Sequence, residues 1–428
     1  MASAIVSLGC GGYNRGVVQS GWWGVSRRLS QPEKGILALL GLLTLLACVA
    51  WGAVVAVYVF LGAGVSEVRI LSPPSGIIVA EGETLVVHAV STGRGLVRSE
   101  LLADGAVAGS LSSPLVAGVT DWSITHSWHA QPQGQHRLSV RVFDLSGGVV
   151  ESLSLVVAVP PPGDIVFSSN RTGNYEIFAM RTDGREPAPI TSGSWQIRQP
   201  SCASKDLLLF TSAVGGGTDI WRMELQTGER SNLTASLGGD RWPRWAPDER
   251  SIAFVSDRFG PGQLFLMKSD GSEPSQLTRG EFPVEQPSWA PDGSALVFAA
   301  QIDGNWDIYR VSADGRTITR LTEDPSEDSQ PAWSPRGDEI AFTSNREGNQ
   351  QIYIMRADGT AQKRITAFPS GAEQAQWSPD GEWIVCATYT GSDERLDARE
   401  IYIMRRDGSD QIRLTDNAFD DTEPDWCE

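Results

Sequence analysis

Six residues at equivalent places in a repeated pattern carry side chains that could contact a ligand. Each stands directly before a Pro-x-Trp segment or a variant of that segment. They are Gln199, Trp242, Gln286, Gln330, Gln374 and Glu423. A carboxamide both donates and accepts hydrogen bonds, so a Gln-rich ring could bind a peptide, a glycan or ordered water. The alternative is that these side chains bond only to neighbouring loops.

The same region offers little for catalysis. It contains no histidine between residues 164 and 428, which removes His-based triads, His general bases and His-rich metal sites. It also contains no G-x-S-x-G elbow on a strand-to-helix turn. Asp and Glu are abundant, but we assign them chiefly to turns. We therefore predict a protein that is not an enzyme, with no catalytic residue, no metal and no cofactor.

A repeat supplies the elements that would position the six residues. Trp245, Trp289, Trp333 and Trp377 lie at intervals of 44 residues. Each copy continues with an Ile-x-Phe strand, an Ile-aromatic strand, a Gly-containing turn and a strand that ends near Leu-Thr. Four short strands repeated six times predict an all-β, six-bladed β-propeller over residues 164–428. The repeated Trp and Ile-Tyr residues are assigned to its core.

The two ends of the repeat array are incomplete in complementary ways. The first copy begins at Asp164 without a Trp-containing strand before it. The last copy is followed by Thr422-Glu423-Pro424-Asp425-Trp426, which matches that missing strand. We therefore expect the C-terminal strand to close the first blade, which removes an exposed sheet edge.

These motifs resemble a known family. The fifth copy runs Ala332-Trp333-Ser334-Pro335-Arg336-Gly337, then Ser344-Asn345-Arg346-Glu347-Gly348, then Ile352-Tyr353-Ile354-Met355, and it is similar to the TolB-like propeller repeat. The resemblance covers Asp164 to the C-terminus and implies an extracytoplasmic protein that binds other proteins. Cys202 and Ala375 depart from the pattern, replacing Trp in the second copy and Pro in the sixth. An insertion at residues 389–399 lengthens one loop of the last copy, and loops on rigid scaffolds often carry function.

Residues 66–159 precede the repeats and form a separate unit. Arg137 to Val142 alternates polar and apolar residues, as does a strand with one buried face. Five similar runs, Val68–Leu71, Thr84–Val90, Val97–Leu102, Trp122–Trp128 and Val149–Val159, predict a β-sandwich. The unit resembles bacterial Ig-like domains through Ser72-Pro73-Pro74-Ser75-Gly76 and Phe143-Asp144-Leu145-Ser146-Gly147. Residues 160–163, Pro-Pro-Pro-Gly, read as a linker.

All four histidines lie in this unit, at His88, His126, His129 and His136. Their proximity in sequence could indicate a metal site. However, His126 and His129 are an odd number of residues apart, so on one strand they would point to opposite faces. We therefore assign them to the sandwich faces.

The N-terminus predicts a membrane anchor. Residues 1–34 read as a disordered cytoplasmic tail, and residues 35–63 read as a transmembrane helix without charges. The basic residues before this segment place the tail inside and both folded units outside the cytoplasm. A cleaved signal peptide, a lipoprotein signal ending at Cys48 and a later start at Val25 remain as alternatives.

Net charge and cysteine spacing exclude some classes of partner and of site. A net charge of −17 argues against nucleic acid. The five cysteines form no C-x-x-C pair, and we read Cys202 and Cys386 as buried thiols. The leading hypothesis is a membrane-anchored binding protein for envelope or secreted proteins. The alternatives are a glycan or cell-wall binding protein and a carboxylate-dependent hydrolase or lyase.

Overall fold

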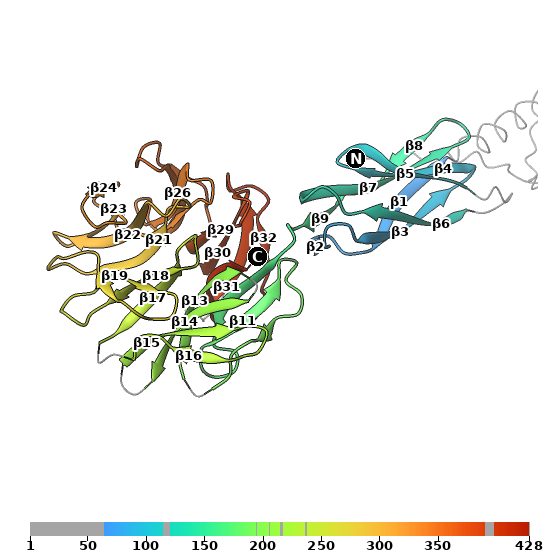
Figure 1. Ribbon diagram of the computed structural model, residues 1–428. Helices are drawn as coiled ribbons and strands as arrows, with labels where there is room; N and C mark the ends of the chain where they lie inside the picture. The colour runs from blue at the N-terminus through green and yellow to red at the C-terminus, as the bar shows by residue number, and fades with distance from the viewer. Residues whose placement is uncertain are drawn as a thin grey trace, which may run out of the picture. The chain divides into compact units, whose positions relative to one another are not determined.

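The computed structural model describes residues 64–113, 120–193, 195–204, 206–214, 217–235, 238–389 and 398–427 (Figure 1). All regular elements in these ranges are β-strands, as the sequence predicts. The predicted tail at residues 1–34 and the predicted transmembrane helix at residues 35–63 lie outside the described residues. Within the described ranges, no helix has the length and apolar character needed to cross a bilayer.

The first part of the described chain consists of two sheets. One sheet has the order β1 (Val65–Ser72), β3 (Thr84–Gly93), β6 (Asp121–His129). The other has the order β2 (Ile77–Ile78), β9 (Leu155–Val159), β7 (Gly134–Asp144), β4 (Leu96–Ala103), β5 (Ala106–Ser112), and β8 (Val149–Glu151) also pairs with β7. Val87 and Ile124 of the first sheet and Leu138 and Val140 of the second are almost fully buried in one shared core. The apolar alternation therefore works as predicted, because each strand contributes one face to that core.

Two details differ from the predicted strands. Val149–Val159 is two strands, β8 and β9, because the hydroxyl of Ser152 accepts the backbone N–H of Val140 and interrupts the ladder. Strands β2 and β5 were not predicted from the sequence. Strand β5 is exposed along most of its length, so it carries no apolar alternation that could reveal it.

The histidines occupy the faces that their spacing predicts. His126 is buried and bonds to Ser99 Oγ at 3.0 Å, whereas His129 is exposed. Burial lowers the pKa of His126. His136 bonds to Asp104 at 2.7 Å. In the part of the chain that the structure describes, no three His, Cys, Asp or Glu side chains gather as metal ligands would.

Residues 164–427 form six four-stranded antiparallel sheets, here numbered 1 to 6. Sheet 1 contains β10 (Asp164–Ser169), β11 (Glu176–Arg181), β12 (Ala188–Pro189) and β33 (Asp421–Cys427). Sheet 2 contains β13 (Ile197–Ser204), β14 (Leu207–Val214), β15 (Gly217–Glu224) and β16 (Arg230–Asn232). Sheet 3 contains β17 (Asp240–Trp245), β18 (Ser251–Ser256), β19 (Gln263–Lys268) and β20 (Ser275–Gln276).

The remaining sheets repeat the same plan. Sheet 4 contains β21 (Val284–Trp289), β22 (Ala295–Ile302), β23 (Asn305–Ser312) and β24 (Ile318–Arg320). Sheet 5 contains β25 (Asp328–Trp333), β26 (Glu339–Ser344), β27 (Gln351–Arg356) and β28 (Lys363–Arg364). Sheet 6 contains β29 (Ala372–Trp377), β30 (Trp383–Tyr389), β31 (Arg399–Arg405) and β32 (Ile412–Arg413). The innermost strands β33, β13, β17, β21, β25 and β29 contact one another in cyclic order, so the sheets surround a common axis.

The structure explains why a threonine recurs in the Leu-Thr and Ile-Thr pairs of the repeat. In every sheet the threonine hydroxyl accepts the backbone N–H of the residue that begins the apolar pair of the third strand, at 2.9–3.0 Å. The fourth strand is only two or three residues long, so this side-chain bond continues the pairing where the ladder ends. The second-strand phenylalanines are fully buried, and with Trp383 they are the largest fully buried side chains of the sheet-to-sheet core.

The C-terminal strand pairs with the first sheet, as predicted. Asp164 of β10 lies opposite Cys427 of β33, and Ser168 lies opposite Thr422. The assignment of Cys202 as a buried thiol is wrong, because Cys202 of β13 forms a disulfide with Cys427. Cys202 occupies the position that Trp holds in the other sheets, next to β33. Cys386 is buried and unpaired, and burial raises the pKa of its thiol to about 12.

Alternate sheets differ at the start of the innermost strand. In sheets 1, 3 and 5 a fully buried aspartate accepts two hydrogen bonds from an arginine of the Ser-Asn-Arg or Ser-Asp-Arg turn. The pairs are Asp421–Arg171, Asp240–Arg258 and Asp328–Arg346. Sheets 2, 4 and 6 have buried Ile197, Val284 and Ala372 at that position. The 44-residue repeat therefore contains a second period of two sheets, which the sequence analysis missed.

Candidate functional site

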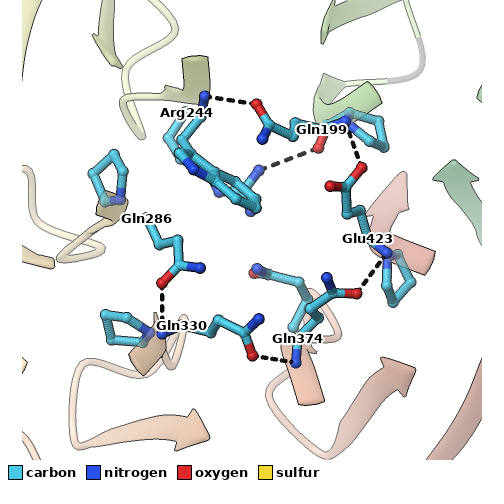
Figure 2. A pocket seen from close by; sticks show the side chains of 12 residues that line it. Gln199, Arg244, Gln286, Gln330, Gln374 and Glu423 are labelled. Carbon is cyan, nitrogen blue, oxygen red and sulfur yellow. Dashed lines mark hydrogen bonds between the residues drawn. The ribbon is translucent and has the colours of Figure 1, made fainter. Parts of the chain in front are cut away.

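The structure brings the six predicted residues together around one opening on the axis, here called the mouth ring (Figure 2). All six have a positive φ, between 53° and 60°. Non-glycine residues adopt this left-handed conformation rarely, so its sixfold recurrence identifies a shared backbone turn. Glu423 lies near Ser168 of β10, and the linker enters that strand at Asp164. The mouth ring is therefore at the end of the sheets away from the linker.

The side chains of the mouth ring form a relay that runs from sheet to sheet. The side-chain oxygen of one residue accepts the backbone N–H of the equivalent residue in the next sheet. The bonds are Gln199 to Trp242 at 3.0 Å, Gln286 to Gln330 at 2.9 Å, Gln330 to Gln374 at 3.0 Å, Gln374 to Glu423 at 2.8 Å and Glu423 to Gln199 at 2.9 Å. Five of the six side chains therefore bond to the neighbouring sheet, which is close to the alternative that they bond only to neighbouring loops.

Trp242 interrupts this relay. Its indole has no acceptor oxygen, so it cannot receive the backbone N–H of Gln286 as a glutamine would. The indole instead packs partly buried against the core between sheets 3 and 4. Between sheets 3 and 4 the relay hydrogen bond is therefore missing, and an aromatic side chain lies beside the opening instead.

The relay determines which groups remain for a ligand. The Oε1 atoms of the four glutamines are occupied, whereas their Nε2 amino groups make none of the hydrogen bonds found among the described residues. Arg198 bonds to Glu423 and lies 4.2 Å above the ring of Tyr175. The opening therefore presents mainly hydrogen-bond donors, which favours a ligand group rich in acceptors.

The cavity at the mouth ring is small, about 30 Å³. A volume of this size holds one or two water molecules. Deeper along the axis, Arg244 donates to Pro200 O at 3.1 Å, and Asp425 accepts the backbone N–H of Cys202 at 3.1 Å. Burial raises the pKa of Asp425, and the positive charge of Arg244 opposes that shift. A ligand would therefore contact the mouth ring without threading the axis.

The repeated tryptophans form a further set of bonds between sheets. The indole N–H groups of Trp289, Trp377 and Trp426 donate to the carbonyls of Arg244, Ala332 and Gln376, each in the preceding sheet. From the sequence, these tryptophans were predicted only as core residues. At the equivalent contact between sheets 1 and 2, where Cys202 replaces Trp, the disulfide links the two sheets instead.

The base of the insertion at residues 389–399 is held by an ion-pair cluster. Arg399 bonds to Glu373 at 2.6 Å and to Asp420 at 2.8 Å, and the Tyr389 hydroxyl donates to Glu373 at 3.2 Å. The side chains of Arg399, Glu373 and Asp420 are largely buried. Residues 390–397 lie outside the described residues. The two ends of the insertion are therefore fixed to sheets 6 and 1 next to the mouth ring.

We expect this cluster to make stability depend on acid pH. Burial alone would raise the pKa of Asp420, but hydrogen bonds from Arg399 and Tyr175 and the charge of Arg399 lower it below its ordinary value. A lowered carboxyl pKa stabilises the fold above the unfolded value of about 4, and this contribution is lost as the pH falls through the folded value. Chemical denaturation between pH 5 and pH 2 should show that decline, and Asp420→Asn should make it shallower. An equally steep decline in the variant would contradict the assignment.

We expect the relay itself to respond to the loss of one acceptor. Gln330 Oε1 accepts the backbone N–H of Gln374 and the hydroxyl of Thr343. Gln330→Leu should lower the free energy of unfolding by about 1–3 kcal/mol, because two donors lose their partner. Gln330→Glu keeps an acceptor and serves as the control in urea unfolding. Equal stability of the leucine variant and the parent would exclude a stabilising relay.

The chain is similar in sequence and in fold to known TolB proteins. Residues 279–399 match the family model described as "TolB beta propeller domain". The ring of sheets is a TolB-like propeller. A crystal structure of TolB from Acinetobacter baumannii aligns with a TM-score of 0.55 at 20% identity, over 70% of this chain and 81% of that chain. At this identity the likeness establishes the fold alone.

Two curated relatives match shorter stretches of the chain. The Tol-Pal system protein TolB of Wolinella succinogenes is 42% identical over 65 residues, which is 15% of each chain. The protein TolB homolog of Chlorobium luteolum is 31% identical over 117 residues, which is 27% of each chain. The matched stretches thus span less than a third of either relative.

Proposed function

We propose that this protein binds other proteins at the cell envelope through the mouth-ring end of its TolB-like propeller. One observation carries the proposal: all six predicted residues surround a single opening, and the Nε2 amino groups of the four glutamines, which have no hydrogen-bond partner among the described residues, suit an acceptor-rich partner. The six sheets serve as the six blades of a rigid head. Backbone carbonyls and carboxylates of a polypeptide are suitable acceptors.

Exposed aromatic residues support the same end of the propeller. Trp195 and Phe419 lie just before the innermost strands of sheets 2 and 1, and Phe259 follows the second strand of sheet 3. Their exposed fractions are 38%, 43% and 75%. Trp and Tyr are enriched at the energetic centres of protein interfaces, and exposed aromatic rings beside a polar opening fit a docking surface.

The other parts of the chain are assigned supporting roles in this proposal. Residues 35–63 anchor the protein in the membrane as a single helix, and residues 1–34 remain in the cytoplasm. The two-sheet unit at residues 66–159 is an Ig-like spacer. The Cys202–Cys427 disulfide supports an extracytoplasmic location for the propeller, because disulfides persist in oxidising compartments.

The proposal assigns binding rather than catalysis to the mouth end. Glu373 and Asp420 are two largely buried carboxylates next to the insertion, and both are bound by Arg399. A glycosidase needs one carboxyl group that can donate a proton and a second that acts as base or nucleophile. The pKa of Asp420 is lowered rather than raised, which is unsuited to a general acid.

Affinity capture from an envelope extract tests the proposal. The full chain in detergent should retain a specific protein, and cross-links should map to the mouth-ring end. Trp195→Ala combined with Phe419→Ala should weaken capture at least about tenfold, as expected for two interface aromatics. Ile318→Ala, which changes an exposed apolar residue on an outer strand, is the matched control. Retention of polysaccharide but no protein would reject the proposal.

A further inference from the structure

A groove between sheets 4 and 5 lies at the end of the propeller away from the mouth ring. Gln330 stands near the start of β25, whereas the groove begins at Trp333, where β25 ends. Its volume is about 430 Å³, within the range of roughly 300–1,000 Å³ that is typical of small-molecule sites. The residues that matter here are Asp292, Ser294, Arg310, Ser312, Trp333 and Arg336.

Trp333 differs from three of the equivalent tryptophans. Its indole N–H donates to Gly337 O in its own sheet at 3.3 Å, whereas Trp289, Trp377 and Trp426 donate to the preceding sheet. The ring is half-buried and lines the groove. Between sheets 4 and 5 the indole of Trp333 is therefore held by a hydrogen bond within sheet 5 and makes no hydrogen bond to sheet 4.

Arg310 is also unusual for its position in the repeat. The equivalent residues in sheets 3, 5 and 6 are Leu266, Ile354 and Ile403, which pack between sheets. Arg310 is exposed, and among the described residues it has neither an ion pair nor a side-chain hydrogen bond. Arg222, its counterpart in sheet 2, donates to Ser269 O of the next sheet. Arg310 therefore leaves a guanidinium available inside the groove.

The remaining polar groups of the groove are held in fixed positions. Asp292 Oδ1 accepts the backbone N–H and the hydroxyl of Ser294 at 2.9 and 2.6 Å. These hydrogen bonds lower the pKa of Asp292, so the carboxylate is ionised and keeps Oδ2 as an acceptor. Arg336 is tied to Glu382 and to Asp380 O. Among the described residues, the groove thus combines an aromatic surface with a guanidinium and a carboxylate oxygen that have no partner.

We propose that this groove binds a neutral saccharide. The C–H face of a sugar ring packs against an indole, and adjacent hydroxyls can pair with the planar guanidinium of Arg310 and the carboxylate of Asp292. The carboxylate opposes an anionic ligand, and the guanidinium opposes a cationic one. A polyhydroxyl ligand without charge satisfies both groups. The proposal is independent of protein binding at the mouth ring.

Calorimetric titration of the full chain with neutral tetrasaccharides tests this site. The probes are chitotetraose, cellotetraose and maltotetraose, with sodium acetate as the anionic comparison. At least one tetrasaccharide should saturate a single site. Arg310→Gln and Asp292→Asn should each weaken that binding by roughly tenfold, as expected for one charge-assisted hydrogen bond. Asp292→Asn keeps the oxygen that accepts from Ser294, so the turn is preserved.

Arg222→Gln is the matched control, since it removes the equivalent arginine from sheet 2. It should leave saccharide affinity unchanged, as should Trp195→Ala at the mouth-ring end. No binding by any of the three tetrasaccharides overturns the proposal. Equal affinity in Arg310→Gln and the parent also overturns it, as does preferential binding of acetate.

Discussion

Removal of the Cys202–Cys427 disulfide should lower the free energy of unfolding by about 5 kcal/mol. The bond joins residues separated by 225 positions in the chain. A cross-link over so long a loop strongly restricts the unfolded chain, and the loop-entropy relation gives about 5 kcal/mol. The paired substitution Cys202→Ser with Cys427→Ser should therefore shift the urea unfolding midpoint to a much lower concentration.

The matched control for this prediction is chemical reduction. Reductant should destabilise the parent to the level of the doubly substituted variant and should leave that variant unchanged. Cys386 is buried and unpaired in both proteins, so it contributes equally to each. If reduction left the parent's midpoint unaltered, the disulfide would have no part in its stability.

Deletion of residues 422–428 should have a larger effect, concentrated in sheet 1. Most of β33 disappears with this segment, which leaves β10 as an exposed edge. Trp426 also leaves the core that contains Ile165 and Phe167, and loss of a buried aromatic costs about 3–5 kcal/mol. We expect the deletion to destabilise the protein beyond the loss of the disulfide alone.

Hydrogen exchange locates this effect. Amides of β10 and β11 should lose protection first, and sheet 6 should follow, because Trp426 also packs against its buried residues. Sheet 4, across the ring, should keep most of its protection. Cys427→Ser retains the strand and separates its contribution from that of the disulfide. Unchanged exchange at Ile165 and Phe167 would contradict strand closure.

The repeat could be predicted from the sequence because its physical causes are local. A strand with one buried face needs apolar residues at every second position, and a tight turn favours glycine, so both recur in each copy. The strand that closes sheet 1 could be predicted because the first copy lacked a Trp-containing strand and the C-terminus supplied one. The exposed edge strand β5 has no such pattern, which is why it was missed.

The arrangement of the six residues around one opening could be predicted, but their hydrogen bonds could not. The place of each residue directly before a Pro-x-Trp segment, or a variant of it, was enough to select the six mouth-ring residues. It could not reveal that their oxygens would be occupied by the next sheet, since that depends on the spacing of neighbouring sheets. Cys202 and Cys427 are distant in sequence, and only the ring brings them together. Arg310 and Trp333 each fit the repeat in sequence, so their groove becomes visible only between sheets.

The disulfide also determines how the protein would carry mechanical force. The covalent loop from Cys202 to Cys427 encloses sheets 3 to 6, the three outer strands of sheet 2 and β33, whereas β10, β11, β12 and most of β13 lie outside it. Tension applied through the linker enters at Asp164, opposite Cys427. A load between the linker and the mouth ring would pull β10 lengthwise, so its hydrogen bonds to β33 would resist together as in shear. The disulfide would then pass that load from β33 to sheet 2, and the rest of the ring would stay closed even if β10 were pulled free.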